Sequence, residues 1–138
     1  MQDHVFHQRD GPEYIDTRLT PQMEKGRLSP SDVSLIKEFL YERKAKKNLS
    51  GGRIALYVDH LIRLRDFLPG PYNEMTTGAY MEAISKIKTG KRLNGDKFSE
   101  NTIHDYILSL KVFSEWLVKK KIVNIPIEEI KEIKVPKA

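Results

Sequence analysis

The sequence of 138 residues contains no cysteine. A chain without cysteine cannot form a disulfide framework, a thiolate zinc site or a cysteine nucleophile. The sequence also lacks an apolar run long enough to cross a bilayer, and residues 1–25 hold no apolar stretch of the length that a signal peptide needs. With 39% hydrophobic and 31% charged residues, the composition is that of a globular protein. We therefore expect a single domain in a bacterial or archaeal cytoplasm, without membrane contact.

Residue patterns for the common catalytic chemistries are also missing. There is no G-x-x-x-x-G-K-[ST] phosphate loop, and no Ser–His–Asp arrangement follows from the spacing. The carboxylates Glu128, Glu129 and Glu132 have the spacing of a solvated helix face. Among the four histidines, His104 can face either DNA or solvent. We expect no catalytic residue, no metal site and no cofactor in this chain, so a stand-alone enzyme is the least favoured class.

What the sequence does have is positive charge concentrated in two places. The formal net charge is +5, of which residues 1–28 contribute −1 and residues 29–138 contribute +6. Residues 43–53 hold five basic side chains and no acidic one, and residues 86–97 hold five against Asp96 alone. Such patches indicate either a polyanion partner, usually nucleic acid, or a solvated face that keeps the protein soluble. The charge pattern alone places four residues on a candidate DNA surface: Lys47, Lys91, Arg92 and Lys97.

Hydrophobic periodicity predicts helices after residue 28 and none before it. Residues 1–28 show no sustained period and are interrupted by Gly11-Pro12, Thr20-Pro21 and Gly26, so we expect a mobile or loosely docked N-terminal extension. Helices are predicted from Ser29 to about Lys46, from Ser50 to about Leu68, from about Thr76 to Ile87, from Ser99 through Leu117, and from Pro126 through Ile133. No stretch has the pattern of a strand. The predicted fold is an all-α bundle of four main helices with a short fifth helix.

Two of the predicted helix starts combine a capping residue with cations. Ser50-Gly51-Gly52-Arg53 places free backbone amides and a guanidinium at one N-terminus, an arrangement that favours a phosphate. Ser99-Glu100-Asn101-Thr102 offers hydroxyl and amide donors at another, close to Arg92 and Lys97 in the sequence. Ordinary capping explains both serines. It does not explain the cations beside them.

The order and spacing of these residues resembles the N-terminal, SAM-like core-binding domain of tyrosine recombinases, the phage-integrase and Xer-type family. The resemblance covers residues 29–138 and is carried by Leu49-Ser50-x-x-Arg53-x-x-x-Tyr57-x-x-x-Leu61-x-x-Leu64-x-x-Phe67-Leu68, by Tyr80-Met81-Glu82-Ala83-Ile84, and by Ser99-x-x-Thr102-Ile103-x-x-Tyr106-Ile107-x-x-Leu110-Lys111-x-Phe113-x-x-Trp116-Leu117-Val118. Lys119-Lys120-Lys121, Asn124-Ile125-Pro126 and Val135-Pro136-Lys137 follow in the family's order. The family often has threonine in place of Arg53, and it commonly has adjacent asparagine and proline, whereas Ile125 separates Asn124 from Pro126 here.

The resemblance implies a module that clamps duplex DNA at a recombination half-site, with its second and fourth helices approaching the major groove. The DNA contacts that it implies are Gly52, Arg53, Asn101, Thr102 and Asp105. The family's catalytic residues lie in a following domain, so residues 29–138 are expected to bind DNA without catalysing a reaction. The expected partners are double-stranded DNA, that C-terminal catalytic domain, and other recombinase protomers.

A helical protein-interaction module without a nucleic-acid role is the alternative. The two hypotheses differ in where the polar residues lie on the surface. Convergence of Arg53, Arg92, Lys97 and Asn101 favours DNA, whereas scattered positions favour the alternative.

Overall fold

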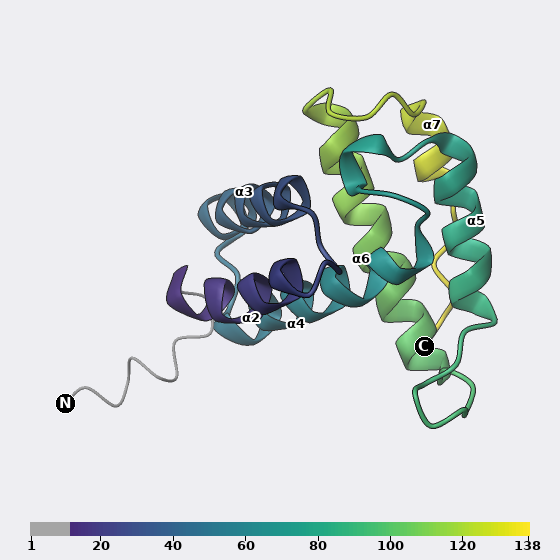
Figure 1. The fold of residues 1–138 in the computed structure, drawn as a ribbon. Coiled ribbons are helices and arrows are strands. Elements are labelled where there is room, and N and C mark those ends of the chain that lie inside the picture. Colours follow the sequence, from purple (N-terminus) through teal and green to yellow (C-terminus); the bar gives the residue numbers. More distant parts are fainter. Residues whose placement is uncertain (1–11) are drawn as a thin grey trace. The chain divides into compact units, whose positions relative to one another are not determined.

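The structure is a computed structural model that describes residues 12–138, with side chains from Tyr14 onward. This part of the chain contains six α-helices, two short 3₁₀ helices and no strand, which confirms the all-α prediction (Figure 1). The α-helices are α2 (Pro12–Glu24), α3 (Pro30–Lys47), α4 (Gly51–Leu64), α5 (Thr77–Lys88), α6 (Glu100–Lys119) and α7 (Ile127–Lys131). The 3₁₀ helices are η1 (Arg65–Phe67) and η2 (Tyr72–Glu74).

Side-chain caps explain why four of these helices begin where the sequence predicts. At each start a hydroxyl oxygen accepts the backbone N–H three residues later, which satisfies one of the donors that a helix N-terminus leaves unpaired. The distances are 3.0 Å for Ser29 and Asp32, 3.2 Å for Ser50 and Arg53, 3.1 Å for Thr76 and Ala79, and 3.1 Å for Ser99 and Thr102. At α3 the Asp32 carboxylate also accepts the Ser29 N–H at 3.0 Å and completes a capping box.

Helix α2 lies within the predicted N-terminal extension, where the sequence predicts no helix. Ile15 and Leu19 are 1% and 0% exposed, and the helix packs against α3. The Arg18 guanidinium also donates to the Asp59 carboxylate of α4, with 2.6 Å between Nη2 and Oδ1. Ile15, Leu19 and Met23 are spaced one turn apart, but Gly11-Pro12 and Thr20-Pro21 interrupt the segment, so the sequence did not predict this helix. The rest of the predicted extension, residues 1–11, lies outside the described residues.

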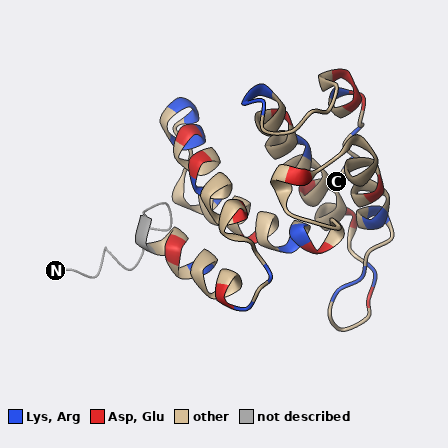
Figure 2. Cartoon of the chain, turned by 45° about the horizontal axis from the view of Figure 1, so that its top comes forward, with Lys and Arg blue, Asp and Glu red and all other residues tan. Residues whose placement is uncertain are grey.

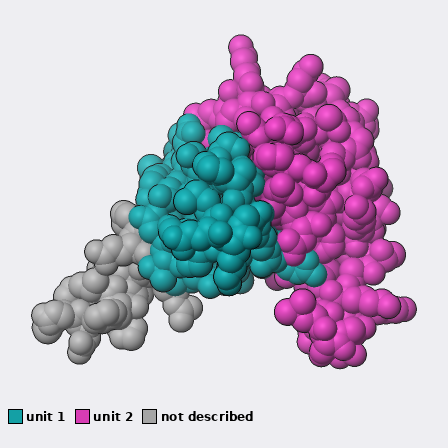
Figure 3. Space-filling view, viewed as in Figure 1, with its two compact units in different colours: residues 1–63 teal, residues 64–138 magenta. Residues whose placement is uncertain are grey.

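The chain divides into two compact units, residues 1–63 and 64–138 (Figure 3). The division falls between Arg63 and Leu64, at the end of α4. The predicted organisation, with an extension over residues 1–28 and one domain over residues 29–138, stays a prediction. Each unit builds its own apolar core.

Unit 1 has a core formed by α2, α3 and α4. The rings of Phe39 and Tyr57 meet edge to face, with 5.7 Å between their centroids, and both side chains are buried. The Arg43 guanidinium lies over these two rings, at 5.7 and 6.0 Å from their centroids. Arg43 therefore belongs to the packing of this unit, although the sequence places it in the first basic patch.

Unit 2 is organised around α6, which packs against both α5 and α7. The sequence predicts this central position, because the apolar stripe of α6 is widened by residues on its flanks. In the core, the Phe113 ring meets Tyr72 edge to face at 4.8 Å and stacks on Trp116 at 5.9 Å. Tyr80 of α5 is 0% exposed. Tyr106 of α6 is half-buried.

Candidate nucleic-acid interface

The basic segment between α5 and α6 folds as a short hairpin. The Phe98 N–H donates to the Gly90 carbonyl at 3.0 Å, and the Arg92 N–H donates to the Asp96 carbonyl at 2.7 Å. Between these two bonds, Lys91 and Lys97 form an isolated antiparallel bridge. Figure 1 shows the hairpin projecting beyond the N-terminal end of α6. A segment that the sequence marks only as a basic connector is therefore an ordered arm.

The tip of the hairpin has a defined turn geometry. Gly95 has φ = 92°, in the region that side chains disfavour, and its N–H donates to the Arg92 carbonyl at 2.9 Å. The Asn94 side chain accepts the Asp96 N–H at 3.0 Å, as asparagine often does in turns. Asn94 and Gly95 therefore shape the turn.

Phe98 anchors the base of the hairpin to the core of unit 2. Its side chain is 8% exposed and its ring meets those of Phe67 and Tyr106 edge to face, with centroid distances of 6.2 and 5.4 Å. The ring covers the α-carbon of Gly90 so closely that a β-carbon there would lie 2.7 Å from Phe98 Cδ2. Neither residue was predicted from the sequence to contribute to the site. The signal in the sequence is an aromatic residue directly before the Ser99 cap, with a glycine at the other end of the basic segment.

The first turns of α6 carry the predicted polar residues of unit 2. Asn101 and Asp105 are exposed and, being four residues apart, lie on one face of the helix. Thr102 is half-buried, and its hydroxyl accepts a hydrogen bond from the Ser99 hydroxyl at 3.0 Å. The Ser99 oxygen caps the Thr102 N–H, which leaves the N–H groups of Glu100 and Asn101 pointing out of the helix end. This end of α6 therefore presents amide donors and the positive end of the helix dipole.

The remaining predicted residues lie in unit 1, where α3 ends and α4 begins. Lys47 is the last residue of α3, and Asn48 reverses the chain with φ = 54°. Gly52 and Arg53 lie in the first turn of α4 and are exposed. The Ser50 hydroxyl accepts the Arg53 N–H at 3.2 Å. The amides of Gly51 and Gly52 remain for a ligand, with no side chain of their own in front of them.

Four of the predicted cations are not neutralised within the described part of the chain. Lys47, Arg53, Arg92 and Lys97 are exposed and form no ion pair with any described residue. Other surface cations do pair: Lys46 with Glu42 at 2.8 Å, and Lys86 with Glu82 at 2.9 Å. Figure 2 shows the blue cations along the arms of the hairpin. The two helix starts therefore carry positive charge that remains available to an anion.

The predicted site residues fall into two groups. Lys91, Arg92, Lys97, Asn101, Thr102 and Asp105 belong to one continuous segment of unit 2 around the start of α6. Lys47, Gly52 and Arg53 belong to the α3–α4 turn of unit 1. The structure brings the members of each group together within their own unit.

His104 is engaged with the C-terminal segment of the chain. Its Nδ1 lies 2.5 Å from the Pro136 carbonyl oxygen. About two turns further along α6, the Lys111 ammonium donates to the Ile133 carbonyl at 2.9 Å. Residues 133–136 therefore run antiparallel to α6, towards its N-terminal end. The His104 residue is half-buried, and its contact with DNA stays a prediction.

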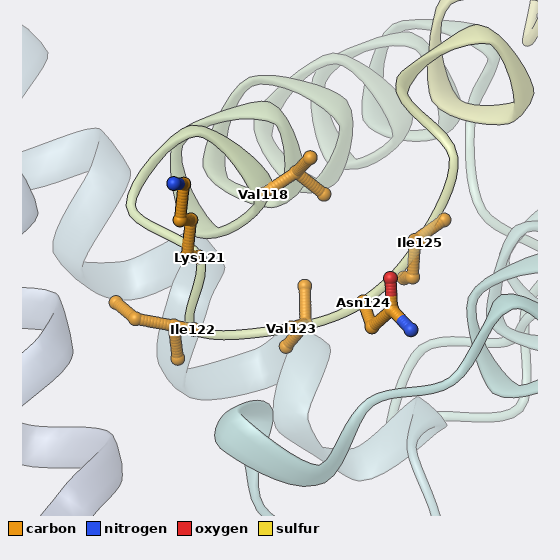
Figure 4. A pocket seen from close by; sticks show the side chains of 6 residues that line it. All are labelled: Val118, Lys121, Ile122, Val123, Asn124 and Ile125. Carbon is orange, nitrogen blue, oxygen red and sulfur yellow. The ribbon is translucent and has the colours of Figure 1, made fainter.

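Unit 2 has a surface pocket near each end of α6. One, of about 200 Å³, lies at the base of the hairpin and is lined by Lys88, Thr89, Gly90, Lys97, Phe98 and Ile103. The other, of about 400 Å³, lies at the opposite end of α6 and is lined by Val118, Lys121, Ile122, Val123, Asn124 and Ile125 (Figure 4). The 20 residues of α6 separate the two ends by roughly 30 Å.

The described residues hold neither a cluster of potential metal ligands nor a membrane-spanning helix. Among residues 14–138, no three His, Asp or Glu side chains gather where they could hold a metal ion. No helix in residues 12–138 combines the length and the apolar character needed to cross a membrane.

Comparisons with protein-family models, with curated proteins and with solved structures find no match to this chain.

Proposed function

We propose that this chain binds duplex DNA and is the core-binding domain of a site-specific tyrosine recombinase. The observation that carries the proposal is the set of exposed, unpaired cations at two helix starts, Arg53 at one and Arg92 and Lys97 at the other. Unpaired lysine and arginine beside free backbone amides are what phosphate contacts require. A face that served only solubility would not need cations and free amides at the same helix ends.

At the start of α6, one set of residues contacts the phosphates and another set contacts the bases. Arg92 and Lys97 on the hairpin, with the Glu100 and Asn101 amides, bind the DNA backbone and set the orientation of the helix. Asn101 then offers its amide to adenine, and Asp105 on the same face accepts from the amino group of cytosine. Thr102 contributes a hydroxyl or a methyl contact. Asp105 repels phosphate, so its place is at a base edge.

At the start of α4, the contacts are with phosphate alone. The Gly51 and Gly52 amides bind one phosphate group, and Arg53 adds a guanidinium that can form two parallel hydrogen bonds. Lys47 supplies a further cation from the preceding helix. This group adds affinity that does not depend on sequence.

The recombinase assignment rests on the resemblance of residues 29–138 to the core-binding domain. In that family the nucleophile and its activating residues belong to a following catalytic domain, and several protomers assemble on the DNA. The proposed partners are therefore duplex DNA, such a catalytic domain and other protomers. By itself the chain is proposed to be a binding module without catalytic activity.

A salt titration of DNA binding tests the proposal. Fluorescence anisotropy with a 30-base-pair duplex pool of random sequence measures the affinity of the full chain between about 50 and 200 mM salt. If roughly five phosphates are neutralised, the logarithm of the affinity falls with the logarithm of the salt concentration at a slope of about −4 to −5. Affinity that is absent at 50 mM salt, or independent of salt, contradicts the proposal.

NMR shift perturbation separates DNA binding from the alternative, a helical protein-interaction module. That alternative is favoured by the apolar pocket between Val118 and Ile125. With duplex DNA we expect the perturbed amides at residues 50–53 and 91–105. Perturbation of residues 118–125 by DNA, with none at the two helix starts, contradicts the proposed interface.

A further inference from the structure

Leu93, at the tip of the hairpin, is an apolar side chain that packs against none of the described residues. Its exposed fraction is 102%, whereas the other large exposed hydrophobic residues among those described, Tyr41 and Leu56, reach 41% and 46%. The proposed DNA contacts do not include it. A single exposed leucine is common on protein surfaces. Leu93 is distinguished by its surroundings, which are a hydrogen-bonded hairpin and several cations.

Leu93 is held out on a rigid support. The hairpin is closed by the Phe98–Gly90 and Arg92–Asp96 backbone bonds, and Phe98 is buried in the core. Asn94 and Gly95 form the turn through bonds of their own. The leucine is therefore presented at a fixed distance from α6, so little entropy is lost when it is placed in a ligand.

The side chains around Leu93 suit a nucleic-acid ligand. The two arms directly behind the tip carry three cations, Lys91, Arg92 and Lys97. Asp96 is the one acidic residue in residues 91–97. An apolar protein partner would be expected to face a wider apolar patch than one side chain. An apolar tip with cations on both sides instead suits a DNA groove, whose walls are phosphates and whose floor is stacked bases.

Resting on the proposed function, we infer that the hairpin enters the minor groove and that Leu93 wedges into a base step there. Leucine is among the side chains that minor-groove proteins insert between base pairs, which partly unstacks the step and bends the duplex. Lys91, Arg92 and Lys97 bind the phosphates on either side of the groove. Flexible steps such as TA, which unstack most readily, are the preferred target. The hairpin thus selects DNA by deformability, while α6 reads base edges.

Permanganate oxidation of unstacked thymines tests this inference. The probe is a 30-base-pair duplex rich in TA steps, bound by the full chain at 50 mM salt. The wild type and Leu93→Met, which keeps an apolar tip, are expected to raise thymine reactivity at one or a few steps. Leu93→Ser is expected to lose that reactivity and to bind about tenfold more weakly, with an unchanged salt slope. Leu56→Ser, which removes an exposed leucine of α4, is the matched control and retains both signals.

The outcomes separate this inference from the proposed function. If the wild type does not bind the duplex at all, the proposed function fails and the inference fails with it. If the wild type binds with the expected salt slope but Leu93→Ser has the same affinity and reactivity pattern, only the wedge is overturned. Loss of self-association in Leu93→Ser, measured by analytical ultracentrifugation, with DNA binding unchanged, also overturns it and identifies a second copy of the chain as the partner of Leu93.

Discussion

The Phe98 ring lies directly over the α-carbon of Gly90, and the Phe98 N–H donates to the Gly90 carbonyl at 3.0 Å. These two residues close the base of the hairpin and connect it to the core of unit 2. The same contact places the cations of the hairpin beside the first turn of α6. The candidate interface therefore depends on an aromatic residue and a glycine, neither of which contacts a ligand in the proposal.

Replacing Gly90 by alanine is expected to destabilise unit 2. The new β-carbon would lie 2.7 Å from Phe98 Cδ2, so the ring must move from its place against Phe67 and Tyr106. Overpacking of this kind costs about 1–3 kcal/mol, which thermal or urea unfolding measures. The control is Gly78→Ala in α5, where no atom outside the helix backbone lies closer than 4.0 Å and stability should rise or stay constant. Equal stability of Gly90→Ala and the wild type would show that Phe98 does not anchor the hairpin.

Replacing Gly52 by alanine is expected to separate folding from DNA binding. A β-carbon there meets nothing closer than the Ser50 hydroxyl at 4.0 Å, and alanine favours the helix by up to about 1 kcal/mol. The added methyl group obstructs the approach of a phosphate to the amides, so affinity should fall by about two- to tenfold. Unfolding curves and anisotropy on the same sample check the two effects. A stabilised variant with undiminished affinity would exclude the start of α4 from the interface.

Neutralising the unpaired cations is expected to reduce the salt dependence of DNA binding. Arg53→Gln, Arg92→Gln and Lys97→Gln should each weaken binding and make the salt slope shallower by about one, because each removes one phosphate contact. Lys25→Gln and Lys131→Gln make the same change in net charge at exposed positions outside the two groups. Because all five variants have the same net charge, the five anisotropy titrations show how the position of the lost cation affects DNA binding. The same loss in all five variants would mean that net charge, and not a built interface, attracts the DNA.

Replacing Tyr80 by phenylalanine is expected to stabilise the protein by about 1 kcal/mol. The Tyr80 hydroxyl is buried and has no hydrogen-bond partner among the described residues, so its removal relieves a desolvation cost. Burial, with the nearby charge of Glu115, raises the pKa of Tyr80 above its ordinary value of about 10. Because the folded-state pKa is the higher one, the ionisation of Tyr80 adds a further loss of stability only as the pH rises above about 10.

The pH dependence of unfolding supplies the control for Tyr80. The difference in free energy of unfolding between Tyr80→Phe and the wild type should be constant below pH 10 and should increase above it. A Tyr80→Phe protein that is less stable than the wild type at neutral pH would show that the hydroxyl has a partner that stabilises it.

The helix starts could be predicted from the sequence because capping is local. Ser29, Ser50, Thr76 and Ser99 each bond to an amide three residues away, so the residues that decide the start are adjacent in the chain. The central place of α6 was also predictable, since its apolar residues cover more than one face. Helix α2 was not predictable, because its stability comes from Ile15 and Leu19 packing against another helix.

For the candidate site, the charged residues and the serines that cap the helices beside them could be read from the sequence. Which of those cations are available depends on the folded structure. Arg43 lies over Phe39 and Tyr57, while Arg53, Arg92 and Lys97 remain exposed without a carboxylate partner among the described residues. Whether a charge is neutralised depends on side chains distant in sequence, and whether a basic segment forms an arm depends on a buried ring. Both are properties of packing, which composition and spacing do not contain.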